Sequence, residues 1–273
     1  MIKKHPLISF VALTVLMTWG GLFVNIMGIF PAFGQWFLYG EGHVVAILRT
    51  RQTLLNWTPN IAAVIVLGVS GGWPRVRELL GRFLKWRVGM RLWLWAVLIP
   101  FMSALGAVGL YGMGGGRIEG NQMGFIPLVL CQRFIFSLST ESIGGEAGWR
   151  GFVLVYLQQR FSPFISTLIV GLIWGLVHFP ILTVRGFVLQ EFFFFGVTIL
   201  CLSVVLTWFY NRTRGSLLVA AFVHAVFNAI DATISRSFVA LMPRGDYMFV
   251  LMMAMMATAT VLIVRTKGRL GLA

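Results

Sequence analysis

Long apolar runs separated by short basic segments are the dominant pattern along the chain. Each run is about 20 residues long, enough for a helix to cross the roughly 30 Å hydrocarbon core of a bilayer. The runs are too long and too continuously apolar for barrel strands, so the pattern predicts an all-α transmembrane bundle of about eight spans. The predicted spans lie near 6–30, 55–73, 92–113, 124–142, 164–184, 189–210, 217–236 and 247–265.

Composition agrees with this pattern. Hydrophobic residues make up 58% of the chain, charged residues 11%, and the mean hydropathy is +0.87, well outside the range of soluble domains. No internal repeat or low-complexity linker interrupts the chain, which predicts a single membrane domain over 1–273.

The first run follows Lys3 and Lys4 but is too long for a signal peptide, so we interpret it as the first span. Cys131 and Cys201 both fall inside apolar runs and suggest no disulfide framework.

The net charge of +14 is first of all a topology signal, because cytoplasmic loops of membrane proteins collect Lys and Arg. With eight spans and a cytoplasmic N-terminus, 15 basic residues fall on the cytoplasmic side, 6 on the outer side, and Arg133 within a span. The 15 are Lys3, Lys4, Arg75, Arg77, Arg82, Lys85, Arg87, Arg91, Arg150, Arg160, Arg212, Arg214, Arg265, Lys267 and Arg269. We therefore expect an integral membrane protein with both termini cytoplasmic, and the basic, methionine- and tryptophan-containing composition suggests a bacterial plasma membrane. The charge is too dispersed for a nucleic-acid partner.

The densest basic segment, residues 74–91, alternates Arg and Lys with Leu, Phe, Trp and Val. This alternation is typical of a helix lying among lipid headgroups, with basic side chains toward anionic lipid. A solvated cytoplasmic loop is the simpler alternative. The segment predicts an interfacial basic helix beside the bundle.

Polar side chains inside the spans are the candidates for chemistry, because a charged group at bilayer depth usually faces a cavity and has a partner. Three pairs, each four residues apart and so on one helix face, are Glu146–Arg150, Trp174–His178 and His224–Asn228. A structural ion pair or a packed core histidine explains any one of them alone. Three together predict convergence on one polar cavity.

The residue types suit hydrolysis. An acid and a histidine activate water, and a histidine with an asparagine stabilises the oxyanion that forms when water attacks a carbonyl. Two histidines and a carboxylate are also a zinc ligand set, but no HExxH motif is present and we expect no metal or other cofactor. A transporter is a further alternative, although the repeated halves and paired broken helices typical of transporters are not found.

Three motifs resemble those of the CPBP family of intramembrane endopeptidases, which includes type II CAAX prenyl proteases and bacteriocin-processing and immunity relatives. "GEAGWRG" at 145–151 resembles the family motif EExxxR, "WGLVH" at 174–178 resembles [FW]xxxH, and "HAVFN" at 224–228 resembles HxxxN. The resemblance covers about 125–232 and implies a helical peptidase acting on peptides or proteins in or at the membrane. It implies that His178 joins a glutamate in activating water and that His224 and Asn228 line the oxyanion hole. Arg150 would anchor the helix, with Trp149 and Trp174 as supporting residues.

One departure from the family pattern concerns the catalytic acid. The first glutamate of EExxxR falls on Gly145, and only the second is present, as Glu146. Three outcomes follow: Glu146 is the base, Glu141 or Asp231 supplies the carboxylate, or the protein is a non-catalytic binding or immunity member. We favour Glu146 and expect it to face, with His178, His224 and Asn228, a single cavity open to the cytoplasmic side.

Overall fold

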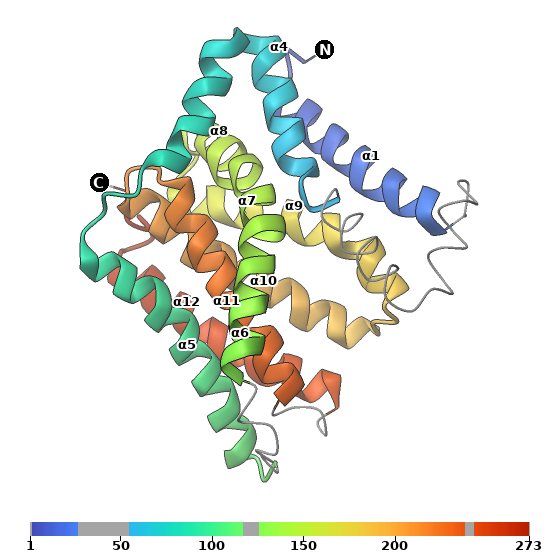
Figure 1. Cartoon of the computed structure of the whole chain (residues 1–273), viewed down its shortest axis with the longest axis vertical. Coiled ribbons are helices and arrows are strands. Elements are labelled where there is room, and N and C mark those ends of the chain that lie inside the picture. Colours follow the sequence, from blue (N-terminus) through green and yellow to red (C-terminus); the bar gives the residue numbers. More distant parts are fainter. Residues whose placement is uncertain (1, 27–54, 117–125, 238–242, 273) are drawn as a thin grey trace.

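The computed structural model describes residues 2–26, 55–116, 126–237 and 243–272, and within these ranges the regular elements are helices (Figure 1). They are α1 (Pro6–Ile26), α4 (Thr58–Gly81), α5 (Met90–Met113), α6 (Ile126–Phe136), α7 (Ile143–Glu146), α8 (Val155–Gln158), α9 (Pro163–Val184), α10 (Leu189–Arg212), α11 (Leu217–Ser237) and α12 (Arg244–Arg265). The predicted all-α class is confirmed. The predicted residues 27–30 of the first span lie outside the described residues.

Six of the described helices are long and apolar enough to cross a membrane: α1, α5, α9, α10, α11 and α12. Their bounds agree closely with six of the predicted spans, and they make the chain an integral membrane protein. The two other predicted runs lie on interrupted helices. The run 55–73 falls on α4, which is broken at Gly72, and the run 124–142 falls on α6 and a π-helical turn that follows it.

The break in α4 separates its apolar half from its basic half. Gly72 has φ +71°, a conformation that glycine adopts without a Cβ clash, and Pro74 begins the second half. That half ends at Gly81, followed by a 3₁₀ turn at Arg82–Leu84, so the basic helix is shorter than the predicted 74–91. A hydrogen bond from Arg82 holds the pKa of the Glu78 carboxyl below its ordinary value.

A single long helix runs from Ile126 to Gln158 through the middle of the bundle (Figure 1). It comprises α6, a π-helical segment at Ser137–Ser142, α7, a second π-helical segment at Ala147–Leu154, and α8. The residues after 142 therefore continue the fourth predicted span. Single π-helical turns inside α-helices are often found at functional sites, and here they flank the "GGE" stretch at 144–146.

Contacts between turns define one end of the bundle. Lys85 Nζ donates to the carbonyl of Arg214 at 3.0 Å, and Ser216 Oγ donates to the carbonyl of Lys85 at 2.6 Å. Asn211 Nδ2 donates to the carbonyl of Leu270 at 3.1 Å, which ties the C-terminal turn to α10. We call this the basic end.

Arg244, at the start of α12, closes the opposite end. Its guanidinium pairs with Glu191 at 2.6 Å and donates to the carbonyls of Arg185 (3.1 Å) and Gly186 (2.8 Å). These contacts tie the turn between α9 and α10 to α12. We call this the distal end.

The helix that carries the first motif lies close against α4. A Cβ built on Gly148 would lie 2.6 Å from the backbone oxygen of Pro59, closer than real Cβ contacts. We therefore expect Gly148→Ala to lower the apparent melting temperature of the protein in detergent, since overpacking a tight contact costs about 1–3 kcal/mol.

The matched control is Gly196→Ala on α10, where an added Cβ meets no atom within 4 Å. Alanine favours a helix more than glycine does, so this variant should melt at or above the wild-type temperature. Equal melting of the two variants would contradict the close approach of α4.

Candidate functional site

A buried carboxylate lies at the centre of the first motif. Glu146 is 0% exposed, and its Oε1 accepts from Arg150 Nη1 at 3.1 Å and from His224 Nδ1 at 2.9 Å. Arg150 is also 0% exposed, so the two opposite charges are desolvated together. Breaking such a pair leaves an uncompensated buried charge, which is strongly destabilising. The pairing fixes Glu146, Arg150 and His224 relative to one another.

Arg150 extends this group to α9 and α10. Its Nη2 donates to Ser203 Oγ at 3.4 Å, and its guanidinium lies 4.7 Å from the centre of the Trp174 ring, a cation–π distance. Arg150 had been counted among the loop residues that set the topology, but it is buried inside the bundle. Its contacts with Ser203 and Trp174 link the long helix to α10 and α9.

Trp174 contacts both histidines. Its carbonyl accepts a hydrogen bond from His178 Nδ1 at 2.8 Å, which leaves His178 Nε2 as the acceptor nitrogen. Its ring lies edge-on to the His224 ring at 5.3 Å between centroids. Trp149, the other supporting tryptophan, is 2% exposed and packs edge-on against Phe10 at 5.6 Å.

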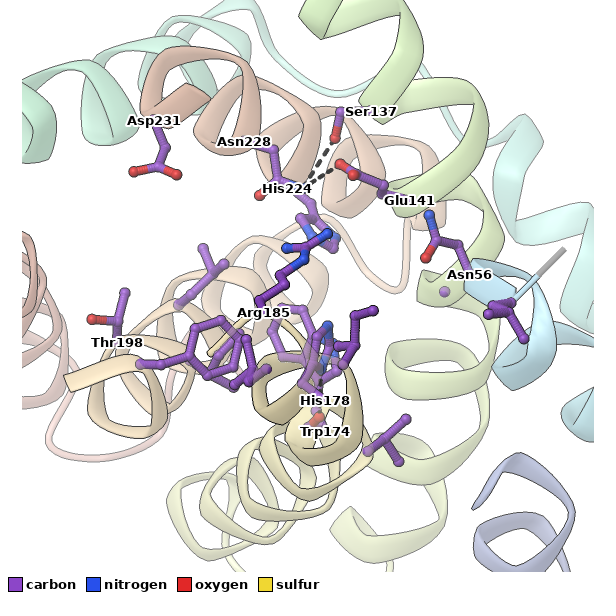
Figure 2. A pocket seen from close by; sticks show the side chains of 18 of the residues that line it. Asn56, Ser137, Glu141, Trp174, His178, Arg185, Thr198, His224, Asn228 and Asp231 are labelled. Carbon is purple, nitrogen blue, oxygen red and sulfur yellow. Dashed lines mark hydrogen bonds between the residues drawn. The ribbon is translucent and has the colours of Figure 1, made fainter. Parts of the chain in front are cut away.

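Asn228 lies one turn beyond His224 on α11 and contacts the first π-helical segment (Figure 2). Its Nδ2 donates to Glu141 Oε2 at 2.8 Å and to Ser137 Oγ at 3.1 Å. Both hydrogens of the amide are therefore engaged. Glu141, one of the alternative acids, is held against the predicted oxyanion residue.

The side chains surround a cavity of about 690 Å³ (Figure 2). Its polar lining includes His178, His224, Asn228, Glu141 and Asp231, with Gly145, Trp149 and Trp174 among the other lining residues. Glu146 and Arg150 do not line it. The structure thus brings three of the four predicted catalytic residues to one cavity, while Glu146 meets the cavity only through His224.

Asp231 occupies a separate part of the cavity wall. Its carboxylate accepts a hydrogen bond from the Tyr247 hydroxyl, which comes from α12. Both residues line the cavity. Tyr247, like Ser137 and Arg185, was not predicted from sequence, because each reaches the site from a part of the chain without a recognisable motif.

Asn60 of α4 is a further residue that sequence analysis missed. Its Oδ1 accepts from the Gly148 backbone N–H at 3.0 Å, and its Nδ2 donates to the Ile143 carbonyl at 2.6 Å. These two backbone groups are five residues apart, the spacing of a π-helical hydrogen bond. The amide of Asn60 bridges them and so supports the turn that carries Glu146. Its only sequence signal was a polar residue at the start of a span.

Gly145 lies at the cavity, where the family motif has its first glutamate. A Cβ built on Gly145 would lie 3.4 Å from Cδ1 and Nε1 of Trp149, an ordinary contact distance. A side chain at this position therefore has room to enter the cavity. Adjacent residues of one helix thus differ in environment: Gly145 lines the cavity and Glu146 is buried behind it.

Within the described ranges, no group of three or more His, Cys, Asp or Glu side chains is arranged to hold a metal ion. His224 and Glu146 bond to each other, and His178 bonds to a backbone carbonyl. Two buried atoms beside them, Glu146 Oε2 and Arg150 Nε, have no hydrogen-bond partner among the described residues.

Comparison with known proteins agrees with these motifs. Residues 126–230 match the family described as type II CAAX prenyl endopeptidase Rce1-like. The chain is also 30% identical over 112 residues to a CAAX prenyl protease 2 of Methanococcus maripaludis, an alignment covering 38% of this chain and 39% of that relative. Both findings support a relationship to the CPBP family, whose three motifs the matched part of the chain resembles. The matched segment contains the three motifs.

The bridge made by Asn60 yields a stability prediction. We expect Asn60→Ala to lower the apparent melting temperature in detergent, because it leaves the Gly148 N–H and the Ile143 carbonyl without their partner. An unsatisfied buried group costs about 1–3 kcal/mol.

Ser139→Ala is the matched control on the same long helix. Ser139 is exposed and its hydroxyl bonds only to carbonyls of its own helix, those of Ile135 and Phe136. We expect it to melt near the wild-type temperature. If Asn60→Ala melts like Ser139→Ala, the bridge does not stabilise this turn.

Proposed function

We propose that this protein is an intramembrane endopeptidase that hydrolyses peptide bonds of substrates in or at the membrane. The observation that carries the proposal is one cavity, inside an apolar bundle, lined by two histidines, an asparagine and a glutamate. Polar groups at such depth are costly and usually functional. The family match supports peptidase chemistry at the level of the family.

In this proposal His178 activates water. Its Nδ1 hydrogen is held by the Trp174 carbonyl, so the lone pair of Nε2 is free to accept a proton from water. The hydroxyl oxygen then attacks the scissile carbonyl carbon, and the amide carbonyl becomes an oxyanion. The proton on Nε2 passes to the leaving nitrogen as the C–N bond breaks.

Glu146 acts through His224. A carboxylate that accepts from one imidazole nitrogen fixes the orientation of the ring and stabilises its protonated form. In this orientation the Nε2 edge of His224 is directed to donate a hydrogen bond to the oxyanion. The prediction of Glu146 as a base in direct contact with water thus becomes the proposal that Glu146 is a positioning carboxylate, since it does not line the cavity.

Asn228 and Glu141 complete the proposed site. Both hydrogens of the Asn228 amide are engaged, by Ser137 and Glu141, so Asn228 must exchange one of these bonds to donate to the oxyanion. When the bond to Glu141 is the one exchanged, a Glu141 oxygen becomes free toward the cavity. Glu141 is therefore the carboxylate that we place beside the water and His178, in the role that the family assigns to the missing first glutamate.

A non-catalytic binding or immunity member is the second candidate function. The observation that favours it is Gly145 at the cavity wall, where the family motif has its first glutamate. The cavity would then hold a peptide without cleaving it. The first candidate function predicts that the wild-type protein cleaves peptides, and the second predicts that it binds them without cleavage.

We expect His178→Ala and Glu146→Gln each to reduce the cleavage rate by about 10²–10⁴-fold, the usual contribution of acid–base groups. Cleavage of membrane-associated peptides, including a prenylated CAAX peptide, is followed by mass spectrometry with protein in liposomes. The control is His5→Ala, since His5 is exposed near the N-terminus and should leave the rate unchanged. Equal size-exclusion profiles establish that the variants are folded. Activity that persists in His178→Ala and Glu146→Gln would contradict the assigned roles.

Gly145→Glu separates the two candidates. If the wild type is active, we expect Gly145→Glu to cleave the peptides no faster than the wild type. The reason is that a second acid beside Glu141 and the histidines perturbs a working site. If the wild type binds the peptides without cleaving them and Gly145→Glu cleaves them, the second candidate is correct. Gly145→Gln is the matched control, because it has the same shape but accepts no proton at neutral pH.

A further inference from the structure

Another pocket lies at the basic end of the bundle, apart from the candidate active site. It has a volume of about 270 Å³ and brings together two segments that are far apart in the sequence. Three of its lining residues are cations and one is an acid, so its net charge is +2. The lining residues are Glu78, Gly81, Arg82 and Lys85, from the end of α4 and the turn after it, and Tyr210, Arg214 and Gly215, from the end of α10 and the turn before α11.

Arg82 holds the two segments of this pocket together. Its Nη1 donates to the Tyr210 hydroxyl oxygen at 2.6 Å and to the carbonyl of Gly151, in the second π-helical segment, at 3.3 Å. Its Nη2 donates to Glu78 Oε1 at 2.8 Å. The acid of the pocket is therefore paired with Arg82. The other two cations of the pocket form no ion pair with an acid among the described residues.

Hydrogen-bond donors in the pocket remain available to a ligand. The ammonium group of Lys85 carries three hydrogens, and among the described residues it donates only to the carbonyl of Arg214, at 3.0 Å. The Tyr210 hydroxyl accepts from Arg82, and its own hydrogen meets no acceptor in the described part of the chain. Unused donors in a pocket of positive charge match the oxygens of a phosphate group, which accept charge-assisted hydrogen bonds.

The position of the pocket indicates the source of this phosphate. Tyr210 and Arg214 lie on either side of the end of α10, one of the helices long and apolar enough to cross a membrane, so the pocket lies near the depth of the lipid headgroups. The residues on either side of Lys85, Leu84 and Trp86, are 79% and 57% exposed. Exposed apolar side chains beside basic ones suit the boundary between headgroups and acyl chains. This setting favours a lipid over a free phosphate ion.

We propose that the pocket binds the phosphate group of an anionic phospholipid such as phosphatidylglycerol. Lys85 Nζ and the Tyr210 hydroxyl donate to phosphate oxygens, and Arg214 adds positive charge. The basic segment 74–91 then has a defined lipid site as well as a general attraction to anionic membranes. The proposal does not depend on the proposed function, because none of the pocket residues lines the candidate active site.

The test is native mass spectrometry of the full chain in a neutral detergent, titrated with phosphatidylglycerol. The pocket variants are Lys85→Gln and Arg214→Asn, singly and together. Asparagine is chosen because residue 214 has φ +53°, which asparagine tolerates better than most residues. We expect the affinity for the first bound lipid to fall about tenfold for each charged hydrogen bond lost. Lys85→Arg keeps the charge and should retain binding.

The matched control is Arg77→Gln combined with Arg91→Gln, which removes the same charge from two exposed residues outside the pocket. We expect this variant to bind phosphatidylglycerol nearly as the wild type does. Equal weakening in the pocket and control variants would overturn the proposal, because binding would then follow the overall surface charge. Equal size-exclusion profiles establish that the variants are folded, and the Gln and Arg variants of Lys85 decide the test if Arg214→Asn does not fold.

Two further titrations of the wild type identify the ligand. Phosphatidylcholine tests the requirement for net negative charge, and soluble glycerol phosphate tests the requirement for a lipid. We expect both to bind more weakly than phosphatidylglycerol. Binding of glycerol phosphate as tight as that of phosphatidylglycerol would overturn the lipid as the source of the phosphate. Equally tight binding of phosphatidylcholine would overturn the preference for an anionic lipid.

Discussion

The buried carboxylate of Glu146 is the constraint on which the site depends. In an apolar bundle an ionised acid needs partners, and Glu146 shares one oxygen between Arg150 and His224. Arg150 then connects the long helix to α10 through Ser203 and to α9 through the Trp174 ring. Trp174 in turn holds His178 by its carbonyl. One charge thus organises residues from four helices around a common cavity.

The long helix gives neighbouring residues different roles. Its π-helical segments flank the "GGE" stretch, and Asn60 bridges the backbone on either side of Glu146. Gly145 consequently lines the cavity while Glu146 is buried behind His224. With glycine at position 145 no side chain enters the cavity there, while the buried ion pair of Glu146 and Arg150 is present. Glu141, on the same helix, is one of two carboxylates that line the cavity, the other being Asp231 of α11.

Sequence patterns predicted the fold well and the site only in part. Hydrophobic runs gave the helical class and the bounds of six membrane-spanning helices, because a helix exposed to lipid must be apolar along its length. The three motifs indicated the family that the comparison supports. Helical spacing could not show which acid faces the cavity, because a π-helical turn shifts side-chain directions relative to an α-helix. Nor could it reveal Asn60, whose contacts with the long helix join residues more than 80 positions apart.

The hydrogen-bonded state of His224 tests the central claim most directly. Nitrogen-15 NMR of histidine-labelled protein in detergent, assigned with single His→Gln variants, identifies which ring nitrogen carries a hydrogen. The account predicts a hydrogen on His224 Nδ1, bonded to the carboxylate, and a change of its resonance in Glu146→Gln. A His224 ring with hydrogen only on Nε2, unaffected by Glu146→Gln, would contradict the claim that Glu146 positions this histidine.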